Sequence, residues 1–389
     1  MSFLFEYIDI NPKETIIRGC LAKKIPMDKL QPFCRDIPEY ETSEFNGGSK
    51  FRNGDTIMAR ITPCLENGKT AMVNILDSNE VGFGSTEYIV FRAKKNLTTP
   101  DFVYYLICSS LVRDPAIKSM VGSSGRQRVQ TDVIANLDID FPKLSDQVKI
   151  AGVLKSLDDK IALNNAINNN LAEQSQAIFA EFMCKYPYVL SPLGDMAEII
   201  DCLHSKKPKA VNGTTYQLLQ LNNITDSGFL DLSSKYYISK SDYENWTRKC
   251  EIVEGDCVIT NVGRIGAVSQ APNGTHAAMG RNMTCIRLRN DKPFYSYLIT
   301  ALLSPHIRRE IMKNTDEGTI MGALNVKNIP LLLFPMFALP TMNALEDLLS
   351  PIRKAIEQNY LSNQMLSLLR DSLLPRLMSG ELDVSNIEI

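Results

Sequence analysis

Residues 145–183 read SDQVKIAGVLKSLDDKIALNNAINNNLAEQSQAIFAEFM, a stretch without proline that holds one glycine, Gly152. Alternating steps of four and three residues separate a set of mostly apolar positions along it. These positions are Ile150, Leu154, Leu157, Ile161, Asn164, Asn168, Leu171, Ser175, Ile178 and Phe182. Because such steps place side chains on one face of a helix, the stretch predicts a long helix with a coiled-coil seam.

A shift of 195 residues maps this seam onto a second one near the end of the chain. The second seam consists of Leu345, Leu349, Ile352, Ile356, Asn359, Asn363, Leu366, Arg370, Leu373 and Leu377. Both seams carry two asparagines at the same places, Asn164 and Asn168 in the first and Asn359 and Asn363 in the second. Chance apolar periodicity does not predict matched polar residues, so we assign these asparagines to a helix–helix core within an internal duplication. Two ordinary amphipathic helices on unrelated cores remain the alternative.

The matched asparagines also indicate how the two helices pair. Two similar halves are expected to be related by near-twofold symmetry, which requires antiparallel helices. When paired residues have numbers that sum to 527, Asn164 meets Asn363 and Asn168 meets Asn359, so the buried amides satisfy each other. The same register places Arg370 opposite a leucine.

Prolines in the second helical pattern predict interruptions. Pro351 lacks a backbone N–H and is expected to break or kink the helix, and Pro375 threatens its far end. Ser350 and Pro351 fit an N-cap and a first helical position, and Ser156 occupies the place that matches Pro351 in the first helix. Each helical region is therefore expected to be a short helix followed by a longer one.

The segments before the two helices correspond as well. Asn53-Gly54-Asp55 precedes the apolar TIMARI and Glu254-Gly255-Asp256 precedes CVITNV, which predicts a turn and a buried strand in each half. A second strand, a helical stretch, a polar loop and an apolar strand ending in Phe-Pro follow in both halves. We therefore predict an α+β protein with two similar strand-rich domains and two long helices packed as an antiparallel coiled coil in a pseudo-twofold repeat. The expected divisions are 1–144, 145–184, 185–338 and 339–389.

Composition excludes several classes of protein. The 389 residues are 44% hydrophobic and 22% charged, which is ordinary for globular domains. No apolar run approaches the roughly 20 residues that span a membrane, and the start of the chain lacks a secretory leader, so we expect a cytoplasmic protein. Nine cysteines without a CxxC pair and three histidines predict neither a metal site nor a cofactor, and we expect the cysteines to be small buried residues.

Clusters of cationic and amide side chains are candidates for contact with nucleic acid, although the net charge of −2 means that such a surface is local or is shared with a basic partner. In a Gly-Ser-rich loop, arginine can contact guanine or phosphate and glutamine can contact adenine. Lysines are expected to bind phosphate, and polar residues in strand-end loops are weaker candidates for reading bases. The candidates are Arg126, Gln127, Arg128, Lys206, Lys207, Lys209, Asn261, Arg264 and Arg281. A solvated surface without a ligand is the alternative for each of them.

The pattern as a whole resembles the specificity subunits of type I restriction-modification systems. The likeness rests on IDFPKLSDQVKIAGVLKSLDDKI, on SLLPRLMSGEL near the end, and on ARITPCLENGKTA followed by GFGSTEYIVFR. It implies that two target-recognition domains each read one half of a bipartite site in double-stranded DNA. It also implies that the helices act as a spacer and dock two methyltransferase subunits, with motor-nuclease subunits joining the full complex.

No catalytic motif accompanies this pattern. An adenine methyltransferase needs an Asn/Asp-Pro-Pro-Tyr/Phe loop, and the sequence has no Pro-Pro pair. Residues 67–70, Asn-Gly-Lys-Thr, imitate the end of a phosphate-binding loop, but Pro63 stands where the first glycine belongs. We therefore expect a subunit without an enzymatic site of its own.

Of three alternative functions, the first finds no room in the chain and the other two remain open. A nuclease or methyltransferase fused to one recognition domain needs about 100 further residues outside the repeat, and the repeat uses nearly the whole chain. A coiled-coil adaptor that binds only protein would differ by failing to bind DNA. A specificity subunit of a related multisubunit restriction system shares every feature described above.

Overall fold

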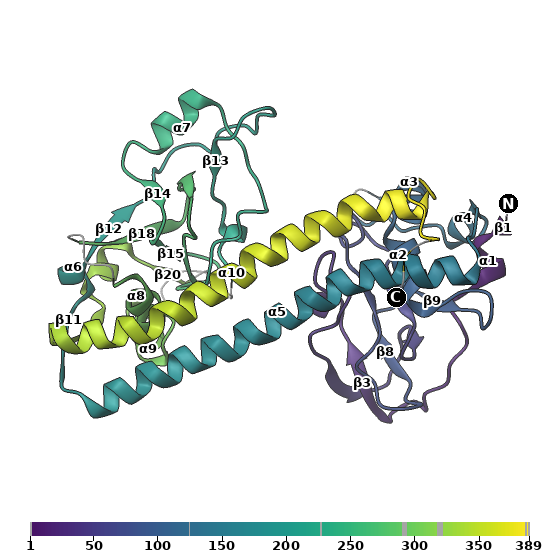
Figure 1. Ribbon diagram of the computed structural model, residues 1–389, viewed down its shortest axis with the longest axis horizontal. Coiled ribbons are helices and arrows are strands. Elements are labelled where there is room, and N and C mark those ends of the chain that lie inside the picture. The colour runs from purple at the N-terminus through teal and green to yellow at the C-terminus, as the bar shows by residue number, and fades with distance from the viewer. Residues whose placement is uncertain are drawn as a thin grey trace. The chain divides into compact units, whose positions relative to one another are not determined.

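The computed structural model describes residues 2–123, 125–225, 228–289, 294–316, 322–385 and 387 (Figure 1). The chain divides into two compact units, residues 1–163 with 363–389 and residues 164–362. Each unit therefore combines one strand-rich segment with parts of both long helices, and the division passes through the helices rather than at their ends. No helix in the described ranges is long and apolar enough to cross a membrane.

The two long helices are α5 (Leu144–Lys185) and α10 (Leu339–Met378). In the first unit, Ile150 of α5 and Leu377 of α10 belong to one apolar core. In the second unit, Phe182 and Leu345 share another. Asp158 also contacts Arg370 in the first unit, and Asn168 contacts Asn359 in the second. In each unit the partner's number therefore falls along α10 as the number along α5 rises, so the helices run antiparallel within each unit.

The asparagines of the seam join α5 and α10 inside the second unit. The Asn359 Nδ2 donates to Asn168 Oδ1 at 2.9 Å, and the Asn168 Nδ2 donates to the carbonyl of Ile356 at 3.3 Å. This is the pairing that the register summing to 527 expects for Asn168. The pairing of Asn164 with Asn363 stays a prediction.

The expected helix breaks are wrong. Helix α10 continues through Pro351 and Pro375, since a proline in a helix interior removes one backbone hydrogen bond and the packed core holds the rest of the turn. Ser156 is not a cap, because its hydroxyl donates to the Val153 carbonyl at 2.7 Å inside α5. Each helical region is one helix.

The first unit builds two four-stranded sheets. Their strand orders are β2-β9-β6-β7 and β4-β3-β8-β5, and a further pair joins β1 to β10. The strands are β1 (Ser2–Phe3), β2 (Ile8–Ile10), β3 (Leu21–Ile25), β4 (Glu41–Glu44), β5 (Lys50–Phe51), β6 (Thr56–Ala59), β7 (Thr70–Met72), β8 (Gly82–Gly84), β9 (Tyr88–Ala93) and β10 (Asp138–Ile139). The helices are α1 (Leu4–Tyr7), α2 (Pro100–Cys108), α3 (Ser110–Lys118), α4 (Thr131–Ala135) and the 3₁₀ turn η1 (Met27–Lys29).

The second unit repeats this topology, except that its second sheet has three strands instead of four. The strand orders are β12-β18-β15-β16 and β13-β17-β14, with the pairs β11-β21 and β19-β20. The strands are β11 (Tyr188–Pro192), β12 (Ala197–Asp201), β13 (Gln217–Leu218), β14 (Glu251–Val253), β15 (Cys257–Thr260), β16 (Val268–Gln270), β17 (His276–Ala278), β18 (Met283–Leu288), β19 (Thr315–Asp316), β20 (Ala323–Leu324) and β21 (Leu333–Phe337). The helices are α6 (Leu193–Met196), α7 (Lys240–Trp246), α8 (Tyr295–Leu302), α9 (Pro305–Lys313), and the 3₁₀ turns η2 (Leu221–Asn223) and η3 (Val326–Leu331). The α+β fold with an internal repeat is confirmed.

The repeat extends to a buried ion pair behind the matched turns. Asp55 accepts from Arg92 at 2.7 Å on both carboxylate oxygens, and Asp256 accepts from Arg287 at 2.7 and 2.5 Å. The hydrogen bonds that the arginines donate to these carboxylates raise the pKa of both arginines, although burial acts the other way. Each aspartate follows a glycine with positive φ, Gly54 or Gly255, a conformation that L side chains rarely adopt. Each Gly-Asp dipeptide thus joins its turn to the neighbouring strand that carries the arginine, β9 in the first unit and β18 in the second.

Arg370, which the chosen register placed opposite a leucine, instead pairs with Asp158. The Arg370 NH1 lies 2.7 Å from Asp158 Oδ1, and the Tyr105 hydroxyl donates to Asp158 Oδ2 at 2.7 Å. Burial alone lowers the pKa of Arg370, but the attraction and hydrogen bond of Asp158 outweigh it and raise that pKa. The pair fastens α10 to α5 and α2 within the first unit.

Candidate nucleic-acid interface

A short loop presents the first group of candidates in the first unit. Val121 and Arg128 form an isolated antiparallel bridge, with backbone N–H···O distances of 3.0 and 2.9 Å. Thr62 N donates to the Gln127 carbonyl at 3.0 Å and fixes the loop to the end of β6. Arg126 lies at the exposed part of this loop, and no side-chain hydrogen bond to it is found among the residues that the structure describes. Its guanidinium is therefore available to a ligand.

Arg128 is held by a neighbouring carboxylate. Its Nε lies 3.0 Å from both oxygens of Glu87, and its NH2 lies 2.6 Å from Oε1. The hydrogen bond from Arg128 keeps the pKa of Glu87 below its usual range. A nucleic acid must compete with Glu87 for Arg128, so Arg126 is the stronger candidate.

The second unit has an equivalent hairpin at the same edge of its sheet. Asp316 pairs with Ala323 as Val121 pairs with Arg128. The Leu324 N–H donates to the Asn261 carbonyl at 2.9 Å, as the Val129 N–H donates to the Arg60 carbonyl. The polar loop that the sequence indicates for residues 314–324 lies in part, at 317–321, outside the described residues.

Asn261 does not suit a base-reading role. Its side chain is 8% exposed, its Nδ2 donates to the Leu324 carbonyl at 3.1 Å, and its Oδ1 accepts from Thr284 Oγ1 at 3.0 Å. Both polar atoms of the carboxamide are engaged inside the fold. We therefore correct this assignment to a structural role.

The remaining candidates differ in whether the fold already engages their side chains. Arg264 is exposed but donates to the Ile224 carbonyl at 3.0 Å, which ties it to the segment that follows η2. Lys206 and Lys209 are exposed on the loop that follows β12. Lys207, on the same loop, extends over the ring of Tyr236 with its Nζ 3.9 Å from the ring centroid. That cation–π contact holds the ammonium group in place.

A pocket of about 400 Å³ brings Lys207 and Arg281 together in the second unit. Its lining is Lys207, Leu218, Gln220, Leu221, Asn222, Trp246, Gly280, Arg281 and Asn282. A Cβ at Gly280 would approach the Leu219 carbonyl oxygen to 2.1 Å, so glycine lets this turn pass close to the sheet. Two of the cations inferred from sequence thus share one polar hollow.

Sequence reasoning missed the amides of this pocket. Asn222 lies on η2 and Asn282 on the turn before β18, 60 positions apart in the chain, so no local pattern links them. The Asn–Gly-rich character of the loop GRNMT around Asn282 was the available signal.

Only some of the cysteines are buried, as the sequence predicts for all of them. Cys202, Cys250, Cys257 and Cys285 are buried, whereas Cys20, Cys34 and Cys184 are exposed. Ligand atoms of Cys250, Asp256 and Cys285 lie within 4.8 Å of one another. Because Asp256 already pairs with Arg287, and the first unit repeats that ion pair without the thiols, we assign the group to the core.

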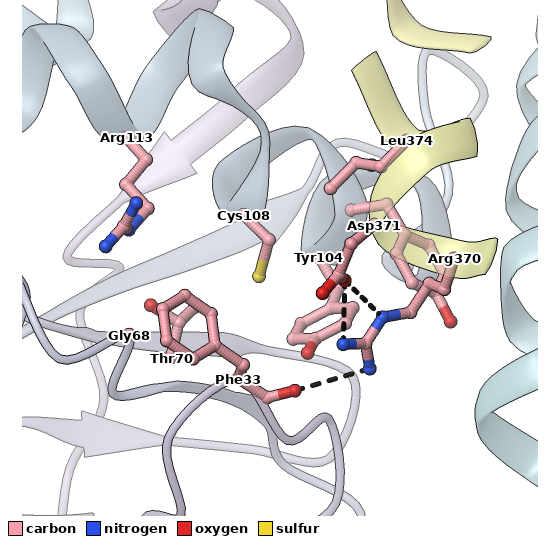
Figure 2. A pocket seen from close by; sticks show the side chains of 10 residues that line it. Phe33, Gly68, Thr70, Tyr104, Cys108, Arg113, Arg370, Asp371 and Leu374 are labelled. Carbon is pink, nitrogen blue, oxygen red and sulfur yellow. Dashed lines mark hydrogen bonds and ion pairs between the residues drawn. The ribbon is translucent and has the colours of Figure 1, made fainter. Parts of the chain in front are cut away.

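A smaller pocket of about 170 Å³ lies beside α10 in the first unit (Figure 2). Phe33, Tyr104, Cys108, Arg113 and Leu374 contribute to its lining. The guanidinium of Arg113 stacks on the Phe33 ring at 5.2 Å, and Figure 2 shows Arg370 turned to Asp371 and the Phe33 carbonyl. Both cations therefore have partners in the fold, and we assign this pocket to imperfect packing.

Comparisons with known proteins agree with this arrangement. Residues 32–173 match the family model described as the type I restriction modification DNA specificity domain. The type I restriction enzyme EcoAI specificity subunit of Escherichia coli is 32% identical over 130 residues, which cover 32% of this chain and 22% of that protein. The HindI specificity subunit of Haemophilus influenzae is 29% identical over 137 residues, 35% of this chain and 29% of that protein. The matches thus span less than a third of the length of either relative.

The fold has a counterpart among solved structures. The S subunit of a type I restriction-modification system from M. genitalium superimposes with a TM-score of 0.53 at 12% identity, covering 97% of this chain and 95% of that one. Residues 32–173 are therefore similar to the type I restriction modification DNA specificity domain, and the chain has the fold of this S subunit, in agreement with the resemblance seen in its sequence.

Proposed function

We propose that this chain is the sequence-recognition subunit of a type I restriction-modification complex and that each unit reads one half of a bipartite site in double-stranded DNA. The observation that carries the proposal is an arrangement that occurs in both units. The hairpin (Val121 paired with Arg128, or Asp316 paired with Ala323) lies beside the turn that precedes the long strand, β9 or β18. We call this arrangement the reading edge. In the first unit this edge presents Arg126 and Gln127. In the second it presents Lys207 and Arg281 around a pocket.

Catalysis is assigned to partner subunits. The specificity subunit supplies sequence readout, and two methyltransferase subunits supply the methyl transfer to adenine, with motor-nuclease subunits added for restriction. An exposed apolar stripe on α10 supports a protein partner: Met365 is 70% exposed, Leu368 67% and Leu369 47%. Solvent-exposed apolar side chains gathered on one helix are typical of an interaction surface.

The acidic balance of the chain fits such a shared complex. With a net charge of −2, the isolated chain is expected to bind DNA weakly, because phosphate contacts dominate affinity. Methyltransferase subunits would add the cationic surface that completes the DNA-binding surface of the complex. Tight sequence-specific binding by the chain alone at physiological salt would argue against this division of roles.

Mapping of methylated adenines tests the proposal. Cells that produce the chain with its methyltransferase partner should acquire methylation at a bipartite motif, and cells with the partner alone should not. A triple variant, Arg126→Ala with Gln127→Ala and Arg128→Ala, should alter or abolish one half-sequence. An adaptor that binds only protein would yield no motif that depends on this chain.

A further inference from the structure

The pocket of the second unit has a built floor and a polar rim. Trp246 is 3% exposed and packs in one cluster with Leu218, Ile238 and Ala278, so the floor is rigid and apolar. Lys207, Asn222, Arg281 and Asn282 are all exposed around the pocket. An apolar base with polar groups around its edge suits a heteroaromatic ligand.

The fold holds the side chain of Asn222 and the backbone of Asn282, whose carbonyl accepts from Asn261 N at 2.9 Å. The neighbour of Asn222, Asn223, is buried and donates to the Ser234 carbonyl at 2.8 Å, which anchors η2. The Asn222 Nδ2 donates to Ser234 Oγ at 2.7 Å, which leaves Oδ1 and one N–H free of that bond. Asn282 adopts φ +64°, and no side-chain hydrogen bond to it is found within the described ranges.

We propose that this pocket reads a base of the second half-site and that the carboxamides of Asn222 and Asn282 recognise the N6 and N7 groups of an adenine. A carboxamide offers one donor and one acceptor side, which matches that edge of adenine. Lys207 and Arg281 then bind the flanking phosphates. The inference rests on the proposed function and assigns chemistry to one of its two reading sites.

The first unit carries different chemistry at the equivalent positions. Glu87 corresponds to Asn282, because their carbonyls accept equivalent hydrogen bonds. The Glu87 carbonyl accepts from the N–H of Arg60, which follows β6, and the Asn282 carbonyl accepts from the N–H of Asn261, which follows β15, each at 2.9 Å. Glu87 is engaged by Arg128. Lys29 corresponds to Asn222, because each lies four positions after the end of a matching parallel strand, Lys29 after Ile25 of β3 and Asn222 after Leu218 of β13. The Lys29 Nζ lies 2.7 Å from Glu39 Oε1. The two units therefore carry different groups at these two positions, and the pair formed by Asn222 and Asn282 belongs to the second unit.

The test uses isosteric variants in the complex with the methyltransferase partner. Asn222→Asp and Asn282→Asp keep the side-chain shape and, at Asn282, tolerance of positive φ, but replace the donor with a second acceptor. Asn273→Asp is the matched control, since Asn273 is exposed in the same unit and lies outside the pocket lining. Binding is measured on duplexes that carry the mapped motif and on duplexes in which purine, which lacks the 6-amino group, replaces each adenine of the second half-site in turn.

At one adenine, wild-type complex should lose roughly 5- to 150-fold in affinity when purine replaces adenine. For at least one of the two pocket variants, replacing that adenine with purine should cause little further loss of affinity. The first half-sequence should be unchanged in methylation maps of every variant. Equal losses from the base change in wild type and in both pocket variants would overturn the inference, because general charge repulsion acts independently of the base. A wild-type complex without any bipartite motif would instead refute the proposed function, and the inference with it.

Discussion

The ion pair between Asp158 and Arg370 should contribute strongly to the stability of the first unit. The side chain of Asp158 is 6% exposed and that of Arg370 is 11% exposed. Within the part of the chain that the structure describes, the change Arg370→Met leaves the carboxylate with the Tyr105 hydroxyl as its side-chain partner, and stranding a buried charge in this way costs about 3–5 kcal/mol. Asp158→Asn keeps an acceptor for Tyr105 and leaves Arg370 beside Asp371, so we expect a smaller loss of about 1–3 kcal/mol.

Hydrogen exchange of the α2 amides in increasing urea measures the free energy of unfolding of this unit. The fluorescence of Trp246, the single tryptophan, follows the second unit in the same samples. Asp371→Asn is the matched control: Asp371 also pairs with Arg370, but it is 58% exposed and should contribute below about 1 kcal/mol. The double variant of Arg370→Met and Asp158→Asn should lose less than the sum of the single losses. The reasoning would be refuted by a loss in Arg370→Met no larger than that in Asp371→Asn.

Three further predictions concern the reading edges. Arg126→Ala should weaken DNA binding by the complex by about 1–3 kcal/mol and Arg128→Ala by less, because Glu87 already engages Arg128; the reverse order in a titration at fixed salt would show that the ion pair opens on DNA. Asn261→Ala should destabilise the second unit by about 1–3 kcal/mol in urea titrations followed by Trp246 fluorescence while the methylation motif stays the same, and an altered motif would restore its base-reading role. Since Arg128 lowers the pKa of Glu87, the stabilisation by Glu87 is fully present above its unfolded pKa of about 4.3 and is lost as pH falls through the lower folded pKa. The stability difference between wild type and Glu87→Gln should therefore be largest near neutral pH and vanish in strong acid, and a difference that grows in acid would show that Arg128 does not stabilise the carboxylate.

Much of the fold could be predicted because the sequence carries it twice. The seams of α5 and α10 and the Gly-Asp turns at Gly54 and Gly255 are local patterns, and each predicts its element without knowledge of distant residues. The expected break at Pro351 failed because a local rule was outweighed by tertiary packing: the apolar cores on both sides hold α10 in one piece. The role of Arg370 was missed for a related reason, since Asp158 adjoins the seam position opposite it.

The candidate site was less predictable. Lys207 and Arg281 were chosen as separate loop cations, and their meeting at one pocket depends on the pairing of Asp201, at the end of β12, with Thr284, at the start of β18. Asn261 looked like a loop residue available to DNA, but the hairpin that ends at Leu324 buries it. Composition can indicate which residues suit nucleic acid, whereas the fold decides which of them reach solvent.

The spacing between the two half-sequences tests the central claim most directly. Insertion of four residues after Asn169, inside α5, lengthens the helix by about 6 Å at 1.5 Å per residue, which corresponds to roughly two base-pair steps of 3.4 Å. Methylated adenines are then mapped in cells that produce this variant with its methyltransferase partner. The account predicts both half-sequences intact with a longer spacer between them. Changed half-sequences with an unchanged spacer would contradict it.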